Sequence, residues 1–585
     1  MNFVVPALNA CEGLRDRGFT FAGKEDLFVS FHDLRVLTQK RAAHYLAQGL
    51  KRGDRVAIVL PEGEHFIPAF LGALWIGLIP VPLYPPLSLG KLDAFMDALV
   101  TILNVARPRV LITTERVGKV LWSAVGRIPS IERVVTSEEL AAEPAGALPP
   151  AADLRPDEVA FLQFTSGSTA LPKGVMVTHG SLAANCKAIV VDGLAADTTR
   201  DVAVSWLPLY HDMGLIGLVL APVCYGISTV YIPTLSFIKN ATTWLETIHR
   251  YRGTLSFAPN FAYALVTKRA KPEQIARWDL SQMRVFGCGA EPINPGTMRA
   301  FVEKFAPSGL KPSALLPCYG MAEATLAIAF IGFDEQLRTD RIDAERYHVD
   351  KKAAPSGSGS LEIVNCGRTF PGHELSIQDE DGRLLPDRHV GEICWRGPSV
   401  AAGYWENPEA TRETFRGGWL YTGDLGYLVD GELYISGRIK DILIVNGRNY
   451  YPQRLEWLVD EIPGVRKGSA VVFTRPGAAS EEIVVAAETR SDDPAGLRAQ
   501  IVSRISEEFQ LAVSDVALVP PGALPKTSSG KLQRRKTRDQ YLRGTLGKEG
   551  RAGNARLAVA KHFALSLVGR AQHQARVFFK RLGGT

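Results

Sequence analysis

The chain has 585 residues, of which 46% are hydrophobic and 22% are charged, as is ordinary for a globular protein in water. This length is too great for one compact core, so we expect two to four folding units. Lys plus Arg exceeds Asp plus Glu by only 67 − 61 = 6 residues, an excess too small to indicate nucleic-acid binding.

The cysteines and the N-terminus predict a cytoplasmic protein. The seven cysteines form no C-x-x-C pair and are odd in number, which favours reduced thiols over disulfides or a zinc site. The first residues lack the basic segment and apolar run of a signal peptide. Apolar runs such as 215–223 are shorter than the ~20 residues of a membrane helix, so we expect no integral membrane segment.

The first half of the chain alternates apolar β-branched runs with helical patterns. Residues 55–60 and 110–113 read as strands, and 65–78 reads as a helix. Such alternation predicts layered α/β subdomains with largely parallel sheets. Because the strand segments are continuously apolar, we expect both faces of these sheets to be covered.

The pattern changes twice further along. From about residue 359, short strands with glycine-containing turns indicate a small β-rich subdomain. After 437–441 a second α/β pattern begins, with strands at 470–473 and 482–487 and a helix at 453–460. The sequence therefore predicts a large N-terminal domain over 1–439, a smaller α+β C-terminal domain over 440–545 and a basic tail over 546–585.

A loop rich in serine, threonine and glycine follows the apolar stretch 159–164. It reads TSGSTALPKG over Thr165–Gly174. Backbone N–H groups and small hydroxyls bring the chain close to phosphate oxygens, although a solvated turn has the same composition. The chain contains neither a Walker loop nor a G-x-S-x-G nucleophile elbow. The residues we expect at a phosphate are Thr165, Ser166, Gly167, Ser168, Thr169 and Lys173.

Six further motifs follow in a fixed order. They are LPLYHDMG (207–214), GCGAEP (287–292), CYGMAEATL (318–326), GWLYTGDLG (418–426), GRIKDILIVNGRNYYP (437–452) and LPKTSSGKLQRR (524–535). Together with the phosphate loop, they resemble the adenylate-forming superfamily of acyl-CoA synthetases, peptide-synthetase adenylation domains and luciferases. The resemblance covers about residues 25 to 545.

The resemblance implies an ATP- and Mg²⁺-dependent enzyme and a role for each motif. The adenine pocket is expected at Gly289, Ala290, Glu291, Tyr319, Gly320 and Met321. Glu323 matches a residue that helps to hold Mg²⁺, a cation that prefers oxygen ligands. Asp424 matches the carboxylate that accepts hydrogen bonds from the ribose, and Arg438 matches an arginine that contacts AMP.

Two lysines match residues that belong to the mobile C-terminal domain of the family or to its hinge. Lys531 corresponds to the lysine that bridges the substrate carboxylate and the α-phosphate, where it stabilises the negative charge of the transition state. Lys440 occupies the hinge position about which the C-terminal domain rotates between two half-reactions. First the carboxylate displaces pyrophosphate from ATP, and then a thiol displaces AMP from the acyl-AMP.

Several details resemble the fatty acyl-AMP ligase branch. These are the motifs around His211, Ala322 in place of the threonine of many CoA-forming relatives, and a possible insertion at about 333–360. In that branch the inserted segment packs between the domains and disfavours the arrangement that accepts CoA. The acid is then a fatty acid, and the acceptor is the phosphopantetheine thiol of an acyl carrier protein acting in trans. A tolerated surface insertion is the alternative explanation of this segment.

Three other readings stay open. A fatty acyl-CoA synthetase would share the first half-reaction. In an amino-acid adenylation enzyme, the aspartate that binds the amino group of the substrate would lie near His211 and Asp212, two residues that we expect in the substrate pocket. The apolar surroundings at 215–223 favour an acyl chain, although such residues more often pack in a core. The third alternative is a non-catalytic binding or scaffold protein. Against it, the residues to which the resemblance gives a role in the reaction, including Glu323, Asp424 and Lys531, are all present.

The tail from Arg543 to Thr585 contains nine Lys or Arg and one Glu. Its apolar residues recur at helical spacing, which predicts an amphipathic helix or a partly disordered segment. The same composition would also suit contact with a membrane surface or an acidic carrier protein. The family resemblance does not extend over its last thirty-odd residues.

Overall fold

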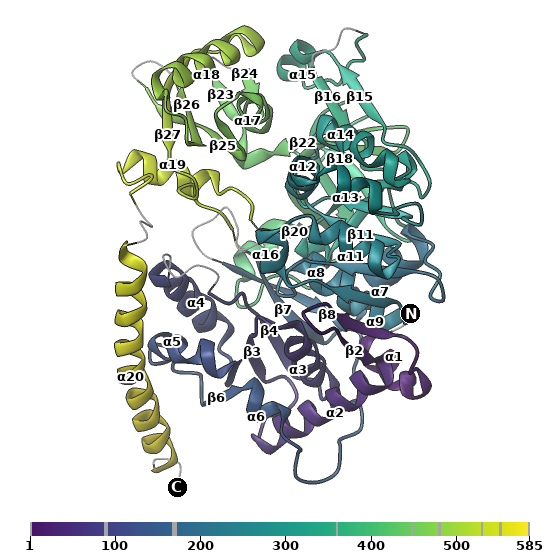
Figure 1. Ribbon diagram of the computed structural model, residues 1–585, viewed down its shortest axis with the longest axis vertical. Coiled ribbons are helices and arrows are strands. Elements are labelled where there is room, and N and C mark those ends of the chain that lie inside the picture. The colour runs from purple at the N-terminus through teal and green to yellow at the C-terminus, as the bar shows by residue number, and fades with distance from the viewer. Residues whose placement is uncertain are drawn as a thin grey trace.

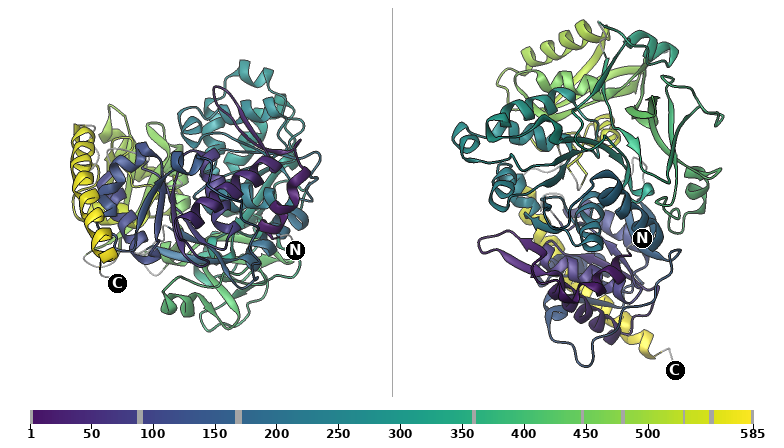
Figure 2. Two further views of the ribbon diagram at one scale, coloured as in Figure 1. Left: turned by 90° about the horizontal axis from the view of Figure 1, so that it is seen from below. Right: turned by 90° about the vertical axis from the view of Figure 1, so that its right-hand side faces the viewer.

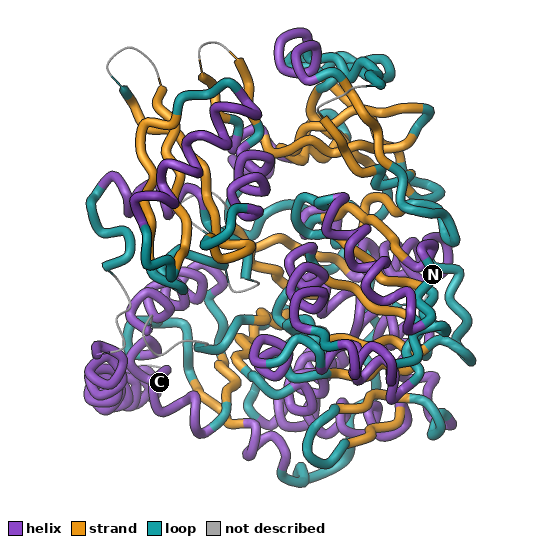
Figure 3. Tube along the Cα trace, turned by 45° about the horizontal axis from the view of Figure 1, so that its top comes forward, coloured by secondary structure: helices purple, strands orange, loops and turns teal. Residues whose placement is uncertain are grey.

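The computed structural model describes residues 3–86, 92–165, 172–357, 361–445, 448–477, 481–527, 530–548 and 553–582. The chain forms a large N-terminal part of several sheets and a smaller C-terminal part, which stands at the upper left in Figure 1. In the lower half of Figure 3 strands lie among helices, whereas in the upper half several strands reach the edge of the molecule. The predicted α/β class is confirmed, and the boundary at 439/440 stays a prediction.

The largest sheet has nine strands and carries several of the expected site motifs. Its order is β17 (Arg368–Thr369), β14 (Ala327–Phe330), β13 (Leu315–Gly320), β12 (Val285–Cys288), β11 (Leu255–Ala258), β9 (Val202–Ser205), β10 (Ser228–Tyr231), β1 (Gly18–Phe21) and β2 (Leu27–Ser30). The strands from β13 to β1 pair in parallel, and the outer pairs are antiparallel. The parallel strands are largely buried, as expected for a sheet with both faces covered.

A second, parallel sheet of four strands lies beside it. Its order is β4 (Ile79–Pro82), β3 (Arg55–Val59), β5 (Val110–Thr113) and β6 (Arg133–Thr136). The helices around it include α2 (Phe31–Ala47), α3 (Gly63–Trp75), α4 (Leu92–Ala106) and α5 (Glu115–Val125). The antiparallel pair β7 (Val159–Thr165) and β8 (Lys173–Thr178) flanks the expected phosphate loop.

The predicted β-rich subdomain is a five-stranded antiparallel sheet. It contains β18 (Glu374–Gln378), β19 (Gly391–Arg396), β20 (Phe415–Arg416), β21 (Trp419–Val429) and β22 (Glu432–Arg438). The segment expected to be inserted folds as β15 (Thr339–Ile342), α15 (Ala344–Asp350) and β16 (Leu361–Val364), of which β15 and β16 pair. Residues 358–360 of this segment lie outside the described ranges.

The C-terminal part has its own apolar core. It contains β23 (Leu443–Val445), β24 (Arg448–Tyr450), α17 (Pro452–Glu461), β25 (Val465–Pro476), β26 (Glu481–Thr489), α18 (Pro494–Phe509), β27 (Val513–Val519) and α19 (Arg534–Leu542). The expected helix at 453–460 and strands at 470–473 and 482–487 match α17, β25 and β26. The tail forms the long helix α20 (Gly553–Leu582), which lies along the N-terminal part beside α4 and α5 (Figures 1 and 2).

The described structure shows the state of the cysteines and the length of each helix. All seven cysteines are free thiols, and six of them are buried. Among the described helices, every one is too short or too polar to cross a bilayer.

Candidate active site

Four charged residues from separate motifs gather where the large sheet, the β-rich subdomain and the C-terminal part meet. Asp424 in β21 and Arg438 at the end of β22 are directly opposite each other in the antiparallel register. Glu323 lies in a short 3-10 turn after β13, and Lys531 lies in the loop before α19. Asp424 and Arg438 both act electrostatically on Lys531, and Arg438 also acts on Glu323.

Asp424 is held by two donors. Its Oδ2 accepts a hydrogen bond from the Tyr319 hydroxyl at 2.7 Å, and its Oδ1 accepts one from Arg438 Nε at 3.1 Å. The charge of Asp424 raises the pKa of Arg438. Burial, followed by the same charge, raises the pKa of Tyr319. An ionised carboxylate has about four lone-pair sites, so Asp424 keeps capacity for further donors.

Glu323 is bound to a residue that the sequence analysis missed. The hydroxyl of Tyr404 donates to Glu323 Oε1 at 2.7 Å, and Lys173 Nζ lies 4.5 Å from the centroid of the Tyr404 ring. Burial raises the pKa of Glu323, whereas the bond from Tyr404 opposes that rise. Tyr404 therefore links the lysine beside the phosphate loop to the buried carboxylate.

Backbone pairing explains how Tyr404 reaches this position. The N–H of Met176 in β8 donates to the Gly403 carbonyl at 2.9 Å, and the Trp405 N–H donates to the Gly174 carbonyl at 2.7 Å. The segment around Tyr404 thus extends the β7–β8 pair. The sequence does not predict this contact, because β8 and Tyr404 are more than two hundred residues apart.

The chain after β12 has a constrained backbone. Ala290 has a φ of +66°, which is uncommon outside glycine and costs conformational energy. A Cβ atom on Gly289 would stand 2.7 Å from both the carbonyl oxygen and the Sγ of Cys318, so only glycine fits. Glu291 accepts a hydrogen bond from the Phe261 N–H at 2.7 Å.

The next strand shows the same close approach. A Cβ on Gly320 would lie 2.0 Å from the Leu326 carbonyl oxygen, and the Met321 N–H donates to that oxygen at 2.8 Å. These bonds fix the turn that presents Glu323. The six residues expected at the adenine pocket thus lie at the ends of the neighbouring strands β12 and β13 and just beyond them.

Lys531 faces several acidic groups. Burial lowers its pKa, and the charges of Asp212 and Glu291 partly offset that effect. Asp212 Oδ1 lies 2.5 Å from His211 Nδ1. Burial alone would raise the pKa of Asp212, but His211 and Lys531 hold it below its ordinary range. The expected substrate-pocket residues therefore lie beside the lysine that would bridge carboxylate and phosphate.

The loop of Lys531 also touches the N-terminal part. A Cβ built on Gly530 would lie 3.7 Å from the Phe261 ring in α12 (Asn260–Arg269). Thr527 and Lys531 close this loop by two hydrogen bonds, from the Lys531 N–H to Thr527 Oγ1 at 3.0 Å and from the Thr527 N–H to the Lys531 carbonyl at 2.7 Å. The loop is thus braced in the position that points Lys531 into the cluster.

The expected hinge residue lies between two differently anchored neighbours. Arg438 bonds to Asp424 in the β-rich subdomain, whereas Asp441 pairs with Arg534 of α19 at 2.7 Å. Lys440 itself is exposed in a 3-10 turn. The backbone at Ile439 and Lys440 therefore connects the two anchored sides.

The phosphate loop is only partly described. Thr165 and Lys173 are directly opposite each other in the β7–β8 pair. Ser166, Gly167, Ser168 and Thr169 lie outside the described residues. Within the described ranges, no three His, Cys, Asp or Glu side chains are arranged to hold a metal ion. Glu323 offers one hard carboxylate, which fits Mg²⁺ that takes its other ligands from phosphate and water.

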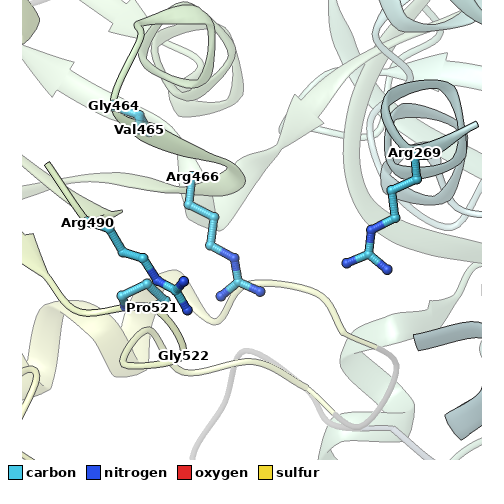
Figure 4. A pocket seen from close by; sticks show the side chains of 7 residues that line it. All are labelled: Arg269, Gly464, Val465, Arg466, Arg490, Pro521 and Gly522. Atoms are coloured by element: carbon cyan, nitrogen blue, oxygen red, sulfur yellow. The ribbon is translucent and has the colours of Figure 1, made fainter. Parts of the chain in front are cut away.

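Two other features lie outside this cluster. Residues 215–224 pack in the main apolar core, apart from the half-buried Gly217. A hollow of about 620 Å³ separates α12 from the C-terminal part, and Figure 4 shows guanidinium groups facing it from both sides. Its charged lining residues are Arg269, Arg466 and Arg490.

Comparison with known proteins identifies the family of the chain. Residues 12–405 match the model of the family described as AMP-binding enzyme, and residues 440–550 match the AMP domain of the Disco-interacting protein 2-like family. A Caulobacter vibrioides protein with the provisional name acyl-CoA synthetase is 39% identical, over 86% of this chain and 89% of its own length.

Two further relatives carry acyl-AMP names. The long-chain-fatty-acid–AMP ligase FadD26 of Mycobacterium marinum is 37% identical, over 84% of this chain and 87% of its own length. A solved structure from work on fatty acyl-adenylate ligases of E. coli and L. pneumophila superimposes with a TM-score of 0.87. It is 34% identical and covers 93% of this chain and 98% of its own.

Proposed function

Because the chain belongs to the AMP-binding enzyme family and is an adenylate-forming ligase, we propose that it activates a fatty acid as acyl-AMP and passes the acyl group to a carrier-protein thiol. The observation that carries the first step is the joint placement of Glu323, Asp424, Arg438 and Lys531. The names of two relatives support the fatty acid as substrate.

The first half-reaction is an in-line displacement. A carboxylate oxygen of the acid forms a bond to the α-phosphorus of ATP, and the bond to the bridging oxygen breaks as pyrophosphate leaves. Such a reaction depends mainly on positioning and charge neutralisation. Lys531 would stabilise the charge shared by the carboxylate and the α-phosphate, and its acidic neighbours help to keep it protonated.

The other residues hold the nucleotide. Asp424 would accept hydrogen bonds from the ribose hydroxyls while Tyr319 and Arg438 fix its orientation. Glu323 would be the protein ligand of Mg²⁺, which when bound neutralises charge on the departing phosphates. Tyr404 orients this carboxylate and favours its ionised form, because a hydrogen bond to an ionised acid lowers its pKa.

The inserted segment supports a carrier protein rather than CoA as acceptor. Tyr347 of α15 is buried, and its ring centroid lies 5.6 Å from that of Tyr451 at the start of α17. The neighbouring His348 ring lies 5.3 Å from Tyr450 and 6.0 Å from Tyr451. These contacts oppose a rotation of the C-terminal part away from the arrangement in which Lys531 faces the site.

The arginine-lined hollow supports the same choice. Arg269 belongs to the N-terminal part, and Arg466 and Arg490 belong to the C-terminal part. Glu488 pairs with Arg466, but no ion pair engages Arg269 or Arg490 in the described part of the chain. A positive surface of this kind would steer an acidic carrier protein toward the junction of the two parts.

One experiment tests both steps. The protein is incubated with ATP, Mg²⁺ and a series of fatty acids, and pyrophosphate is measured before either CoA or a phosphopantetheinylated carrier protein is added. We expect acid-dependent pyrophosphate release that Lys531→Ala abolishes, and transfer to the carrier only. A wild-type protein that releases no pyrophosphate with any carboxylic acid would refute the first step and leave the scaffold reading.

Fatty acyl-CoA synthesis is the second candidate, since one relative carries a synthetase name. Efficient acyl-CoA formation by the wild type would select it and leave the first step intact. Tyr347→Ala distinguishes the role of the insertion. We expect this variant to use CoA at least tenfold faster than the wild type, with pyrophosphate release unchanged. Unchanged rejection of CoA would mean that the contact with Tyr451 is not the gate.

A further inference from the structure

Helix α20 is fixed to the N-terminal part by its polar side. Ser566 Oγ accepts a hydrogen bond from the Ser123 N–H at 3.0 Å, and Ser123 Oγ lies 3.0 Å from His562 Nδ1. The guanidinium of Arg576 donates to the carbonyl of Gly126 at 2.6 Å and to that of Ile128 at 3.0 Å. The residues that α20 buries are thus polar ones at helical spacing.

A close backbone approach sets the rotation of α20 about its axis. A Cβ on Gly569 would lie 2.1 Å from the Trp122 carbonyl oxygen, so this position admits no side chain. One turn further, the His573 ring centroid lies 5.3 Å from that of Trp122. Because His562, Ser566, Gly569 and His573 all face α5, the opposite side of α20 must point away from the protein.

That outward side is apolar. Phe563, Leu567 and Val568 are 48%, 67% and 53% exposed. The exposed alanines Ala560, Ala564, Ala571 and Ala575 continue the same side of the helix. A surface helix ordinarily shows the reverse arrangement, with its apolar stripe toward the core. Figures 1 and 2 show α20 at the margin of the molecule, where its outward side is accessible.

The charge of α20 indicates what covers this side. The helix contains six basic residues and no Asp or Glu: Arg556, Lys561, Arg570, Arg576, Lys580 and Arg581. Three of them contact the N-terminal part, since Lys561 pairs with Asp93 at 2.8 Å, Arg570 lies 5.9 Å from the centroid of the Trp122 ring and Arg576 bonds to two carbonyls. An apolar helix side with basic residues along the helix suits the headgroup region of an anionic bilayer. Pairing two copies of α20 would instead bring like charges together.

We propose that α20 is an interfacial helix that seats the protein on an anionic lipid surface, with Phe563, Leu567 and Val568 inserted among the acyl chains. The polar side, already bonded to α5, does not need to detach. The proposal is independent of the substrate and acceptor proposed above, since lipid binding requires neither ATP nor a fatty acid.

The test is co-sedimentation of the full chain with vesicles of phosphatidylglycerol and phosphatidylcholine, in the absence of ATP. We expect binding to the phosphatidylglycerol-rich vesicles that weakens as salt rises. The double variant F563S/L567S should lower the partition coefficient at least tenfold. Leu384→Ser is the matched control, because Leu384 is 70% exposed on the β-rich subdomain, far from α20 in the sequence. Its vesicle binding should equal that of the wild type.

Three results would overturn the proposal. One is a wild type that does not sediment with anionic vesicles, and another is a double variant that binds as well as the wild type. The third is a wild type that forms a stable dimer in light scattering and does not bind vesicles, with F563S/L567S being monomeric. That result would assign the apolar side to a second copy of the chain. Unchanged pyrophosphate release by the double variant shows that it is folded.

Discussion

Removing the hydroxyl of Tyr404 tests whether this residue tunes the charge of Glu323. In Tyr404→Phe the ring beneath Lys173 remains, so the cation–π contact at 4.5 Å is retained. The 2.7 Å hydrogen bond to Glu323 Oε1 is lost. A hydrogen bond to a charged group contributes about 1.5–3 kcal/mol, which corresponds to about 1–2 pH units.

The sign follows from the two protonation states. Burial already raises the pKa of Glu323, and the Tyr404 bond lowers it, so losing the bond raises the pKa further. If ionised Glu323 holds Mg²⁺, activity falls as the pH decreases through this pKa. We therefore expect the acid limb of kcat/KM for ATP to move up by about 1–2 pH units in Tyr404→Phe, and the Mg²⁺ requirement to rise.

The assay is continuous pyrophosphate release over a range of pH at subsaturating ATP. Tyr263→Phe is the control, because the hydroxyl of Tyr263 donates to the Gly287 carbonyl at 2.7 Å in the buried core. That variant should lose about 1 kcal/mol of stability and keep its pH profile. A Tyr404→Phe profile whose acid limb does not move would refute the reasoning, even if the overall rate fell.

Three further substitutions have defined outcomes. Gly289→Ala forces a Cβ to 2.7 Å from the Cys318 carbonyl, so we expect a KM for ATP at least tenfold higher and a lower melting temperature. Burial lowers the pKa of His179 to about 4, so its neutral form is required in the fold and stability falls as the pH drops from 6.5 toward 4. Between pH 7 and pH 4.5 the free energy of unfolding should fall less in His179→Gln than in the wild type, by up to about 3 kcal/mol, as measured by denaturant unfolding. The same pH dependence in both proteins would contradict this prediction. Lys440→Pro restricts the backbone between the two anchored sides, so pyrophosphate release should persist while transfer to a thiol falls at least tenfold in single-turnover assays.

Most of the candidate site could be proposed from the sequence because its residues sit in contiguous motifs, and their roles stay predictions. Four separate motifs contribute Glu323, Asp424, Arg438 and Lys531. The structure brings these four residues close together. The alternating strand and helix patterns likewise predicted the α/β layers, since hydrophobic periodicity reflects burial directly.

What the sequence could not predict depends on contacts between distant segments. Tyr404 reaches Glu323 only because its segment pairs with β8, and a lone Tyr in a loop carries no signal of that pairing. Similarly, the tail predicts an amphipathic helix, but which side it buries depends on the surface it meets. The close approach of Gly569 to Trp122 and the bonds from Arg576 to the Gly126 and Ile128 carbonyls decide that α20 buries its polar side.

The contacts around α15 give a physical reason for preferring a protein acceptor. Tyr347 packs near Tyr451, and Lys531 lies beside the acidic Asp212 and Glu291 of the N-terminal part, so both interactions favour the arrangement in which Lys531 faces the site. If, as proposed, a thiol reaches the acyl-AMP only after the C-terminal part rotates, these contacts must break first, and exposing buried aromatic surface costs about 25 cal/mol per Å². A carrier protein can offset that cost, because a standard interface buries about 800 Å² on each partner. CoA is a small molecule that offers far less surface, so under this proposal the same contacts would select against it.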